Sequence, residues 1–297
     1  MRLLLVGANG QVGHALTRSL APLGEVVATT RSGRLDDDVA CETLDLSDLD
    51  AIAPLVARVR PDAVVNAAAY TAVDRAEDEV ELAFRINAQA SGRLAMACAD
   101  ADVPLVHYST DYVFDGRGSR PYRDDDPTAP LGAYGRSKRD GELAIADSGA
   151  RHLILRTAWV YGLHGQNFLR TMLRVGAERD ELRVVADQHG CPTPAWLIAD
   201  VTAAILRTGI VASGIRHLVA GGQTTWHGFA DAIFDEALQR GLIARRPVVT
   251  PIGTADYPTR AVRPTYSVLD TERLRGEYGV QLPDWRDALS QTLADAV

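Results

Sequence analysis

The chain has 297 residues, 46% of them hydrophobic and 24% charged, which is enough for one large or two fused globular domains. Its 31 Lys and Arg against 39 Asp and Glu give a net charge of −8, which argues against nucleic acid or an anionic membrane as partner. Three scattered cysteines, no CxxC pair and no apolar run of membrane-spanning length predict a cytoplasmic protein.

The first half of the sequence alternates short apolar runs with longer helical patterns. We expect strands over residues 3–6, 25–30, 63–65, 105–108 and 152–156, and helices over 12–21, 47–60 (with Ser47 as N-cap), 79–100 and 134–147. Continuous apolar strands that alternate with helices are typical of a parallel sheet covered on both faces. The pattern therefore predicts an α/β protein with a Rossmann-type doubly wound sheet.

The second half has a looser pattern. We expect helices over 167–179, 195–208 and 225–241 (with Thr225 as cap), a strand over 216–219, and a proline-rich loop over 247–264. This predicts a dinucleotide-binding domain, 1–158 plus about 195–213, and a smaller α/β substrate lobe, about 159–194 plus 214–297. The acidic runs 36–38 and 124–126 are expected to be solvated loops.

A glycine turn follows the first expected strand and opens the first expected helix. In this G-x-x-G-x-x-G run, Gly7 permits a sharp turn, Gly10 lets the backbone approach a pyrophosphate, and Gly13 lets the helix pack closely on the sheet. The helix N-terminus offers N–H groups and a positive dipole end to phosphates. We therefore assign Gly7, Asn9, Gly10, Gln11, Val12 and Gly13 to dinucleotide binding, the alternative being a turn without a ligand.

The second expected strand ends without a carboxylate. An acid at this position would bind the ribose 2′-hydroxyl of NAD, whereas here Arg31 and Ser32 follow the strand and suit a 2′-phosphate. We therefore expect NADPH as the cofactor, with NADH tolerated. The alternative for Arg31 is an ordinary surface arginine.

A Y-x-x-x-K motif, Tyr134 and Lys138, is expected on one helix face. A nearby cation lowers the pKa of a phenol, which makes Tyr134 a usable proton donor near neutral pH. Thr110 follows the fourth strand, at the edge where such sheets bind ligands, and is expected to hydrogen-bond the carbonyl being reduced. The motif alone is common by chance, but with the glycine turn it predicts a nicotinamide-dependent enzyme.

Segments 10–13, 65–74, 108–114, 156–161 and 217–222 carry a resemblance to known proteins. The chain resembles the extended short-chain dehydrogenase/reductase superfamily and, within it, the dTDP-4-dehydrorhamnose reductase family. The run Ser109 to Phe114, STDYVF, is more specific than the glycine turn. The resemblance implies NADPH-dependent reduction of the C4 keto group of dTDP-4-dehydro-6-deoxy-L-mannose to dTDP-L-rhamnose, the last step in making this sugar donor for cell-surface polysaccharide such as O-antigen.

The resemblance also implies roles for individual residues. The cofactor would be contacted further by Asp45 and Leu46 at the adenine and by Ala67, Ala68, Ala69, Tyr70 and Thr71 towards the nicotinamide ribose. Thr110, Tyr134 and Lys138 would form the catalytic triad, Tyr134 and Lys138 would also contact the cofactor, and Asn87 would support the site. The nucleotide sugar would contact Thr110, Asp111, Tyr134 and Trp159, with Asn167 and Arg263 at the diphosphate.

Family resemblance raises the question of a metal. Members are described as Mg²⁺-dependent, and some form metal-bridged dimers through a carboxylate on the first helix. That position looks like Ala15 here, so we expect a monomer or a homodimer without this bridge, and the sequence shows no metal ligand set. The seven histidines show no ligand spacing, and only His107 and His189 lie near the expected cleft.

Two other functions share this fold. An NAD-dependent nucleotide-sugar epimerase or dehydratase would carry Asp-Glu after the strand-end Thr, whereas Asp111 is followed here by Tyr112. A non-catalytic regulatory subunit would lack an intact catalytic pair, whereas Tyr134 and Lys138 are both present. These residues favour the reductase.

Overall fold

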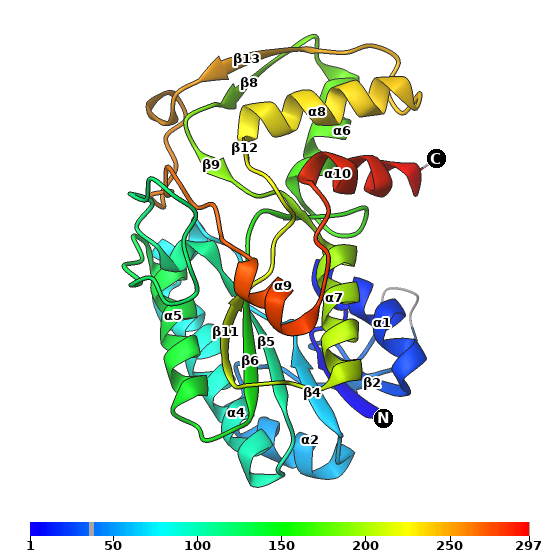
Figure 1. Ribbon diagram of the computed structural model, residues 1–297, viewed down its shortest axis with the longest axis vertical. Coiled ribbons are helices and arrows are strands. Elements are labelled where there is room, and N and C mark those ends of the chain that lie inside the picture. Colours follow the sequence, from blue (N-terminus) through cyan, green and yellow to red (C-terminus); the bar gives the residue numbers. More distant parts are fainter. Residues whose placement is uncertain (36–38, 297) are drawn as a thin grey trace.

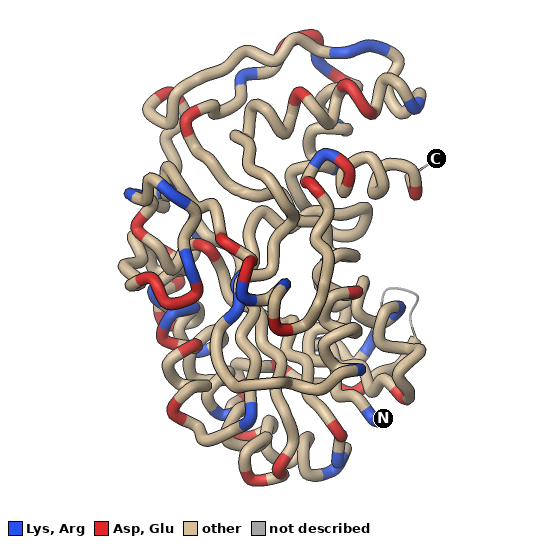
Figure 2. Tube along the Cα trace, in the orientation of Figure 1, with Lys and Arg blue, Asp and Glu red and all other residues tan. Residues whose placement is uncertain are grey.

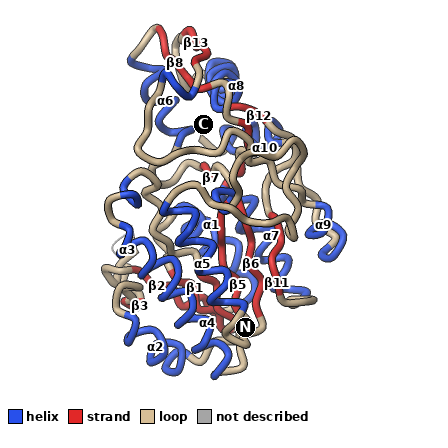
Figure 3. Tube along the Cα trace, turned by 90° about the vertical axis from the view of Figure 1, so that its left-hand side faces the viewer, coloured by secondary structure: helices blue, strands red, loops and turns tan. Residues whose placement is uncertain are grey.

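The computed structural model describes residues 1–35 and 39–296, so the acidic run 36–38 lies outside the described residues. Its centre is a seven-stranded sheet in the order β11-β6-β5-β4-β1-β2-β3, in which every neighbouring pair is parallel. The strands are β1 (Arg2–Val6), β2 (Glu25–Thr30), β3 (Glu42–Thr43), β4 (Ala63–Asn66), β5 (Leu105–Thr110), β6 (His152–Thr157) and β11 (Gly214–His217). The predicted Rossmann-type α/β fold is confirmed (Figures 1 and 3).

Helices cover both faces of this sheet because side chains alternate along each strand. On β1, Leu3 and Leu5 pack with α1 (Gln11–Leu20) and α7 (Ala195–Thr208), while Leu4 and Val6 belong to the core formed with the opposite helices. Those helices are α2 (Ile52–Val59), α4 (Ala90–Asp100) and α5 (Ala133–Ala146). Burial on both faces explains why the strands read as continuous apolar runs.

The strand order reverses beside β1, which pairs with β2 on one side and with β4 on the other. Connections leave β1 and β4 in opposite directions, and a crevice opens at the carboxyl ends of the two strands. The glycine turn lies at the end of β1, so the sheet topology itself places it at a ligand-binding position.

A second group of elements lies beyond the carboxyl ends of the sheet strands (Figure 1). It contains α6 (Phe168–Glu178), α8 (Trp226–Gln239) and α10 (Trp285–Ala294), while α9 (Glu272–Tyr278) packs against β11. Three two-stranded sheets complete it: β7 (Val160–Tyr161) with β10 (Thr193–Pro194), β9 (His189–Gly190) with β12 (Thr224–Thr225), and β8 (Glu181–Val185) with β13 (Val248–Ile252). Basic and acidic positions are interspersed over both groups (Figure 2).

Two strand predictions need correction. The expected loop 247–264 contains β13, which pairs in parallel with β8. Pro251 lies within β13, and because β8 is its single neighbour in that sheet, the missing N–H can face away from the pairing. The strand expected at 216–219 lies at Gly214–His217 and is the seventh strand of the main sheet, so these residues lie with the sheet and not, as the sequence predicts, with the lobe.

Most expected helices are found with bounds shifted by one or two residues, and two of them differ by more. Asp48, rather than Ser47, caps the 3-10 turn Leu49–Ala51 that leads into α2, because its side chain accepts from the N–H of Asp50. The helix expected over 79–100 consists of α3 (Val80–Phe84), a π-helical turn (Arg85–Gln89) and α4. The cap at Thr225 is confirmed, with its hydroxyl accepting from Gly228 N–H at 3.0 Å. Further 3-10 turns are Ala21–Leu23, Arg75–Glu77, Asp111–Val113 and Thr254–Asp256.

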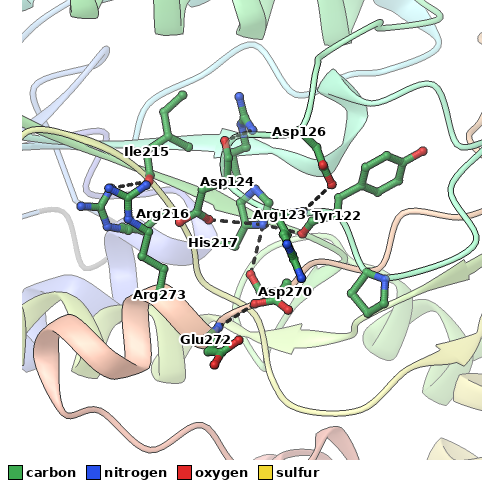
Figure 4. A network of polar contacts seen from close by, with 12 residues as sticks. Tyr122, Arg123, Asp124, Asp126, Ile215, Arg216, His217, Asp270, Glu272 and Arg273 are labelled. Atoms are coloured by element: carbon green, nitrogen blue, oxygen red, sulfur yellow. Dashed lines mark hydrogen bonds and ion pairs between the residues drawn. The ribbon is translucent and has the colours of Figure 1, made fainter.

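The prediction of a solvated loop at 124–126 is wrong for Asp124. Its side chain is only 7% exposed and lies 3.5 Å from Nδ1 of His217 (Figure 4). Asp126 instead forms an ion pair with Arg120. None of the helices in the described part of the chain is both long and apolar enough to cross a membrane.

Candidate active site

A cavity of about 550 Å³ lies at the carboxyl ends of the central strands and brings distant motifs together. It is bordered by the glycine turn, by the ends of β2, β4, β5 and β6, and by α5. Of the residues expected to bind the cofactor, it is lined by Gly7, Asn9, Gly10, Gln11, Val12, Arg31, Asp45, Leu46, Ala67, Ala68, Ala69, Thr71, Tyr134 and Lys138.

The glycine turn has the geometry that its spacing requires. Gly7 has a φ of +83°, and a Cβ there would lie 2.7 Å from Ala68. A Cβ on Gly13 would lie 2.0 Å from the carbonyl oxygen of Gly7, so Gly13 serves the packing of α1 and does not line the cavity. Gly10 is the N-cap of α1 without a side-chain cap bond, which leaves the first N–H groups of the helix available to an anion.

The far end of the cavity combines a cation with a carboxylate. Arg31 and Asp45 both line it, and Leu46 adds an apolar wall. Hydrogen bonds from Ser47 lower the pKa of Asp45, and the charge of Arg31 lowers it further. Ser32 is not among the lining residues; its hydroxyl lies 3.3 Å from both Thr30 Oγ1 and the carbonyl oxygen of Arg34.

The segment after β4 is held from outside the cavity by Asn87. The Asn87 side chain accepts from Tyr70 N–H at 2.8 Å and donates to the Tyr70 carbonyl at 3.0 Å. Asn87 lies in the π-helical turn, a feature that is frequent at functional sites. Tyr70 itself points away, since its hydroxyl donates to Glu79 at 2.7 Å, and the wall is formed by its neighbours.

Tyr134 and Lys138 lie one turn apart on α5 and share the cavity. Burial raises the pKa of the Tyr134 phenol, and a hydrogen bond with Thr110 opposes this rise. Lys138 is not among the groups that shift this pKa here, so its expected lowering of the Tyr134 pKa stays a prediction. The Lys138 amino group instead donates to the Tyr108 carbonyl at 2.7 Å and lies 3.2 Å from Nε2 of His107.

Thr110 and Asp111 are buried at the end of β5, beside Tyr134. The Thr110 hydroxyl lies 3.1 Å from an Asp111 carboxylate oxygen and accepts from Tyr112 N–H at 3.1 Å. Burial raises the pKa of Asp111 to about 6. A hydroxyl and a phenol close together in a buried setting are suited to a carbonyl oxygen that gains negative charge.

The remaining residues expected at the substrate differ in their positions. Arg263 donates to the hydroxyl of Tyr112 at 3.1 Å, and the ring of Tyr112 contacts Tyr134 edge-on at 5.7 Å, so Arg263 lies on the Tyr134 side of the site. Trp159 has a φ of +46° and stacks on Trp226 at 3.6 Å. Asn167 caps α6, and its amide also donates to the Gly162 carbonyl, which gives it a structural task.

Sequence reasoning missed several residues of the cavity wall. The hydroxyls of Ser109 and Thr157 are buried, have no hydrogen-bond partner, and belong to residues that line the cavity. Thr157 is the register partner of Thr110 at the end of the adjacent strand, so the rule that ligands bind at strand ends could have found it. Gly165 and Gln166 line the cavity from the loop before α6 and carried no comparable signal.

No group of three or more His, Cys, Asp or Glu side chains that could hold a metal ion occurs in the described ranges. Asp45 is the single carboxylate among the described residues that line the cavity, whereas Arg31, Lys138 and the open N-terminus of α1 all present donors, which suits a phosphorylated ligand better than a cation.

The sheet topology, the glycine turn at its switch point and the Tyr-Lys pair define a nicotinamide-dependent oxidoreductase of the short-chain type. A family model described as RmlD substrate binding domain matches residues 1–297. The chain belongs to the dTDP-4-dehydrorhamnose reductase family.

Relatives support this family over the full length. The dTDP-4-dehydrorhamnose reductase of Burkholderia thailandensis is 47% identical over 306 aligned residues, covering 99% of each chain. That of Salmonella typhimurium is 43% identical, covering 99% of this chain and 98% of the relative. Among solved structures, the dTDP-4-dehydrorhamnose reductase of Bacillus anthracis in complex with NADP has a TM-score of 0.90 at 33% identity and covers 99% of each chain.

Proposed function

We propose that this chain catalyses NADPH-dependent reduction of the C4 keto group of dTDP-4-dehydro-6-deoxy-L-mannose to give dTDP-L-rhamnose. The observation that carries this proposal is that one cavity of about 550 Å³ joins the glycine turn to Tyr134 and Lys138. Full-length similarity to reductases of that name supports the substrate.

The cavity fits a dinucleotide. The open N-terminus of α1 suits the pyrophosphate, and Asp45 and Leu46 suit the adenine end. Arg31 lines the same end without a strand-end acid, so NADPH would be preferred to NADH. The relative from Bacillus anthracis was crystallised with NADP, which supports this choice.

The bound nicotinamide would supply the hydride. Thr110 would orient the keto oxygen, and Tyr134 would give its phenolic proton to that oxygen as negative charge develops. Lys138 would hold the ribose on the nicotinamide side. Most of the rate enhancement would come from orientation and from stabilising the oxyanion.

The lobe beyond the strand ends would bind the nucleotide sugar. We assign it residues of about 159–194 and 218–297, with Trp159 at the sugar and Arg263 towards the diphosphate. Arg263 is the better supported of the two, because it is joined to Tyr134 through Tyr112. The contacts of Asn167 give no support to a substrate role.

The position of Ala15 on α1 bears on assembly. Its side chain packs against the apolar core, so we propose a monomer or a homodimer without a metal bridge at this helix. With NADPH as the reductant, we propose that the protein works in the cytoplasm.

A coupled test would use the purified chain with the dTDP keto-sugar and either NADPH or NADH. We expect stoichiometric loss of NADPH absorbance and formation of dTDP-L-rhamnose. A chain that binds NADPH but oxidises none with this sugar would overturn the substrate assignment. Interconversion of nucleotide sugars without consumption of added NADPH would identify an epimerase instead.

A further inference from the structure

A line of three buried polar side chains runs from the sheet to α5. Asn66 ends β4, His107 lies on β5 as its register partner, and Lys138 projects from α5. Their exposed fractions are 1%, 0% and 2%. Asn66 Nδ2 lies 3.1 Å from His107 Nδ1, and His107 Nε2 lies 3.2 Å from Lys138 Nζ.

Lys138 is the only lysine of the chain, and the other 30 of its 31 Lys and Arg residues are arginine. An arginine stays charged in proteins, whereas a lysine amine can titrate when it is buried. Lys138 therefore places an amine that can gain or lose a proton beside His107, whereas an arginine would place only a fixed positive charge there.

Hydrogen-bond directions fix the proton of His107. Asn66 Oδ1 accepts from Ala68 N–H at 3.1 Å, so its NH₂ group faces His107 and can only donate. His107 Nδ1 must then accept, and the neutral ring carries its proton on Nε2, which faces Lys138. Burial lowers the pKa of His107 well below its ordinary value and Lys138 lowers it further, which supports the neutral ring.

The position of the His107 proton determines whether the site favours a neutral or a protonated Lys138 amino group. A neutral amine can donate to the Tyr108 carbonyl and use its lone pair to accept from His107, whereas an ammonium would set N–H against N–H. Burial lowers the pKa of Lys138 to about 8, with Glu142 opposing.

The other charged or titratable groups around this line are few. Glu142 lies on the same helix and is held by Arg156 of β6 at 2.8 and 2.7 Å, which limits its pull on the lysine. Tyr134 precedes Lys138 by one turn, and Tyr108 faces it through its carbonyl. The π-helical turn contributes Asn87, which does not titrate.

We infer that His107, oriented by Asn66, is a positioning residue that fixes the Lys138 amine at the Tyr108 carbonyl and sets the pH at which this lysine takes up a proton. This role rests on the proposed function only in so far as Lys138 serves the reduction. The arrangement of the three side chains is a property of the folded chain.

The test uses the full-length protein made with ¹³Cε-lysine and ¹⁵N-histidine. The single lysine gives one assigned ¹³C signal, and the spectrum of His107→Gln identifies the His107 nitrogens. We expect the parent protein to show the Nε2–H form of His107. An Nδ1–H form in the parent would overturn the inference without any variant.

The variant Asn66→Asp should reverse the direction of the hydrogen bonds that join residue 66, His107 and Lys138. A carboxylate would draw the imidazole proton to Nδ1 and turn the Nε2 lone pair towards Lys138, so the lysine titration midpoint should rise by about 1 pH unit or more. The double variant Asn66→Asp/His107→Phe keeps the new charge but removes the ring, and should lose most of this rise. His152→Gln, which alters another buried histidine away from this line, is the matched control.

A midpoint that is unchanged in Asn66→Asp, or that rises equally in the double variant, would overturn the inference. The basic limb of kcat against pH should move with the NMR midpoint. If the dTDP keto-sugar is not reduced at all, the proposed function fails while the NMR midpoints still decide the role of His107.

Discussion

Tyr134 provides the most direct residue-scale prediction. Replacing it with Phe keeps the ring against Tyr112 but removes the phenolic proton, so kcat for the keto-sugar should fall by about 10²–10⁴-fold. NADPH affinity, measured by fluorescence titration, should change little. Tyr278→Phe removes a phenolic hydroxyl on α9, away from the cavity, and should retain full activity. A Tyr134→Phe enzyme as fast as the parent would identify another proton donor.

Arg31 tests the choice between the two nicotinamide cofactors. Its guanidinium lines the adenine end of the cavity, where a 2′-phosphate would lie. Arg31→Ala should raise Kd for NADPH by about tenfold, or about 1.4 kcal/mol, and leave Kd for NADH nearly unchanged. Isothermal titration of both cofactors measures this difference, with Arg18→Ala as a control elsewhere on the surface. An equal loss for both would show that Arg31 does not read the phosphate.

Local motifs identified part of the cavity lining: the glycine turn, Arg31 after a strand end, and Tyr134 and Lys138 four apart on a helix. The other lining residues at the adenine end and those after β4 came from the family resemblance instead. Sequence reasoning did not foresee the partners of Lys138. His107 and Asn66 are 31 and 72 positions away, respectively, and meet it only because β4 and β5 pair and α5 packs against β5. It also treated Asp124 as solvated, since a run of three acids gives no local sign that one of them is buried.

At the scale of one element, two glycines in the turn into α1 have different roles. A Cβ on Gly13 would lie 2.0 Å from the Gly7 carbonyl oxygen, whereas a Cβ on Gly10 would have its nearest neighbour at 3.5 Å. Gly13→Ala should therefore lower the melting temperature and expression, because α1 must shift away from the sheet. Gly10→Ala should melt like the parent but bind NADPH more weakly, because the methyl group would occupy the space of the pyrophosphate. Equal melting temperatures for the two variants would contradict this division.

The elements that sequence reasoning found are those with strong apolar signals. β1, β4, β5 and β6 are buried on both faces and stand out, whereas β8 and β13 form a small two-stranded sheet in which exposed and buried positions mix. Pro251 within β13 pointed to a loop, and only the pairing with β8 shows otherwise. The sequence did not indicate the π-helical turn at Arg85–Gln89, which contains Asn87, because one widened turn leaves the helical pattern almost intact.

At the scale of the whole molecule, a buried polar network ties three distant segments together at the β11 edge of the sheet (Figure 4). His217 Nδ1 lies 3.1 Å from the Tyr122 carbonyl, 3.2 Å from the Asp270 carbonyl and 3.5 Å from Asp124. Backbone bonds reinforce the joint, since Asp270 N–H donates to the Tyr122 carbonyl. The sheet, the loop with Tyr122 and the C-terminal segment with Asp270 are thus held together by contacts of two titratable side chains, Asp124 and His217.

Asp124 makes the stability of this joint depend on pH. Burial raises its pKa to about 6, although Arg216, Arg273 and Arg156 oppose this, whereas an aspartate in the unfolded chain has a value of about 3.9. At a pH between these two pKa values, Asp124 is therefore protonated in the folded state and ionised in the unfolded state. The contribution of Asp124 to stability is complete below about pH 4 and is lost as the pH rises through 6. His217 acts in the opposite sense, since burial lowers its pKa to about 3 and acid favours the unfolded state.

Comparing the parent with Asp124→Asn isolates the carboxyl group, because the amide cannot ionise. The two proteins should have nearly equal free energies of unfolding at pH 4, and the variant should become more stable by about 1–3 kcal/mol at pH 7.5. Urea unfolding across this range measures the difference directly. Asp125→Asn removes the same charge from an exposed neighbour and should give a nearly constant difference from the parent. The prediction is contradicted if the stability of Asp124→Asn relative to the parent falls between pH 4 and pH 7.5. The ionised carboxylate would then stabilise the joint, because its attraction to the three arginines outweighs the cost of burial.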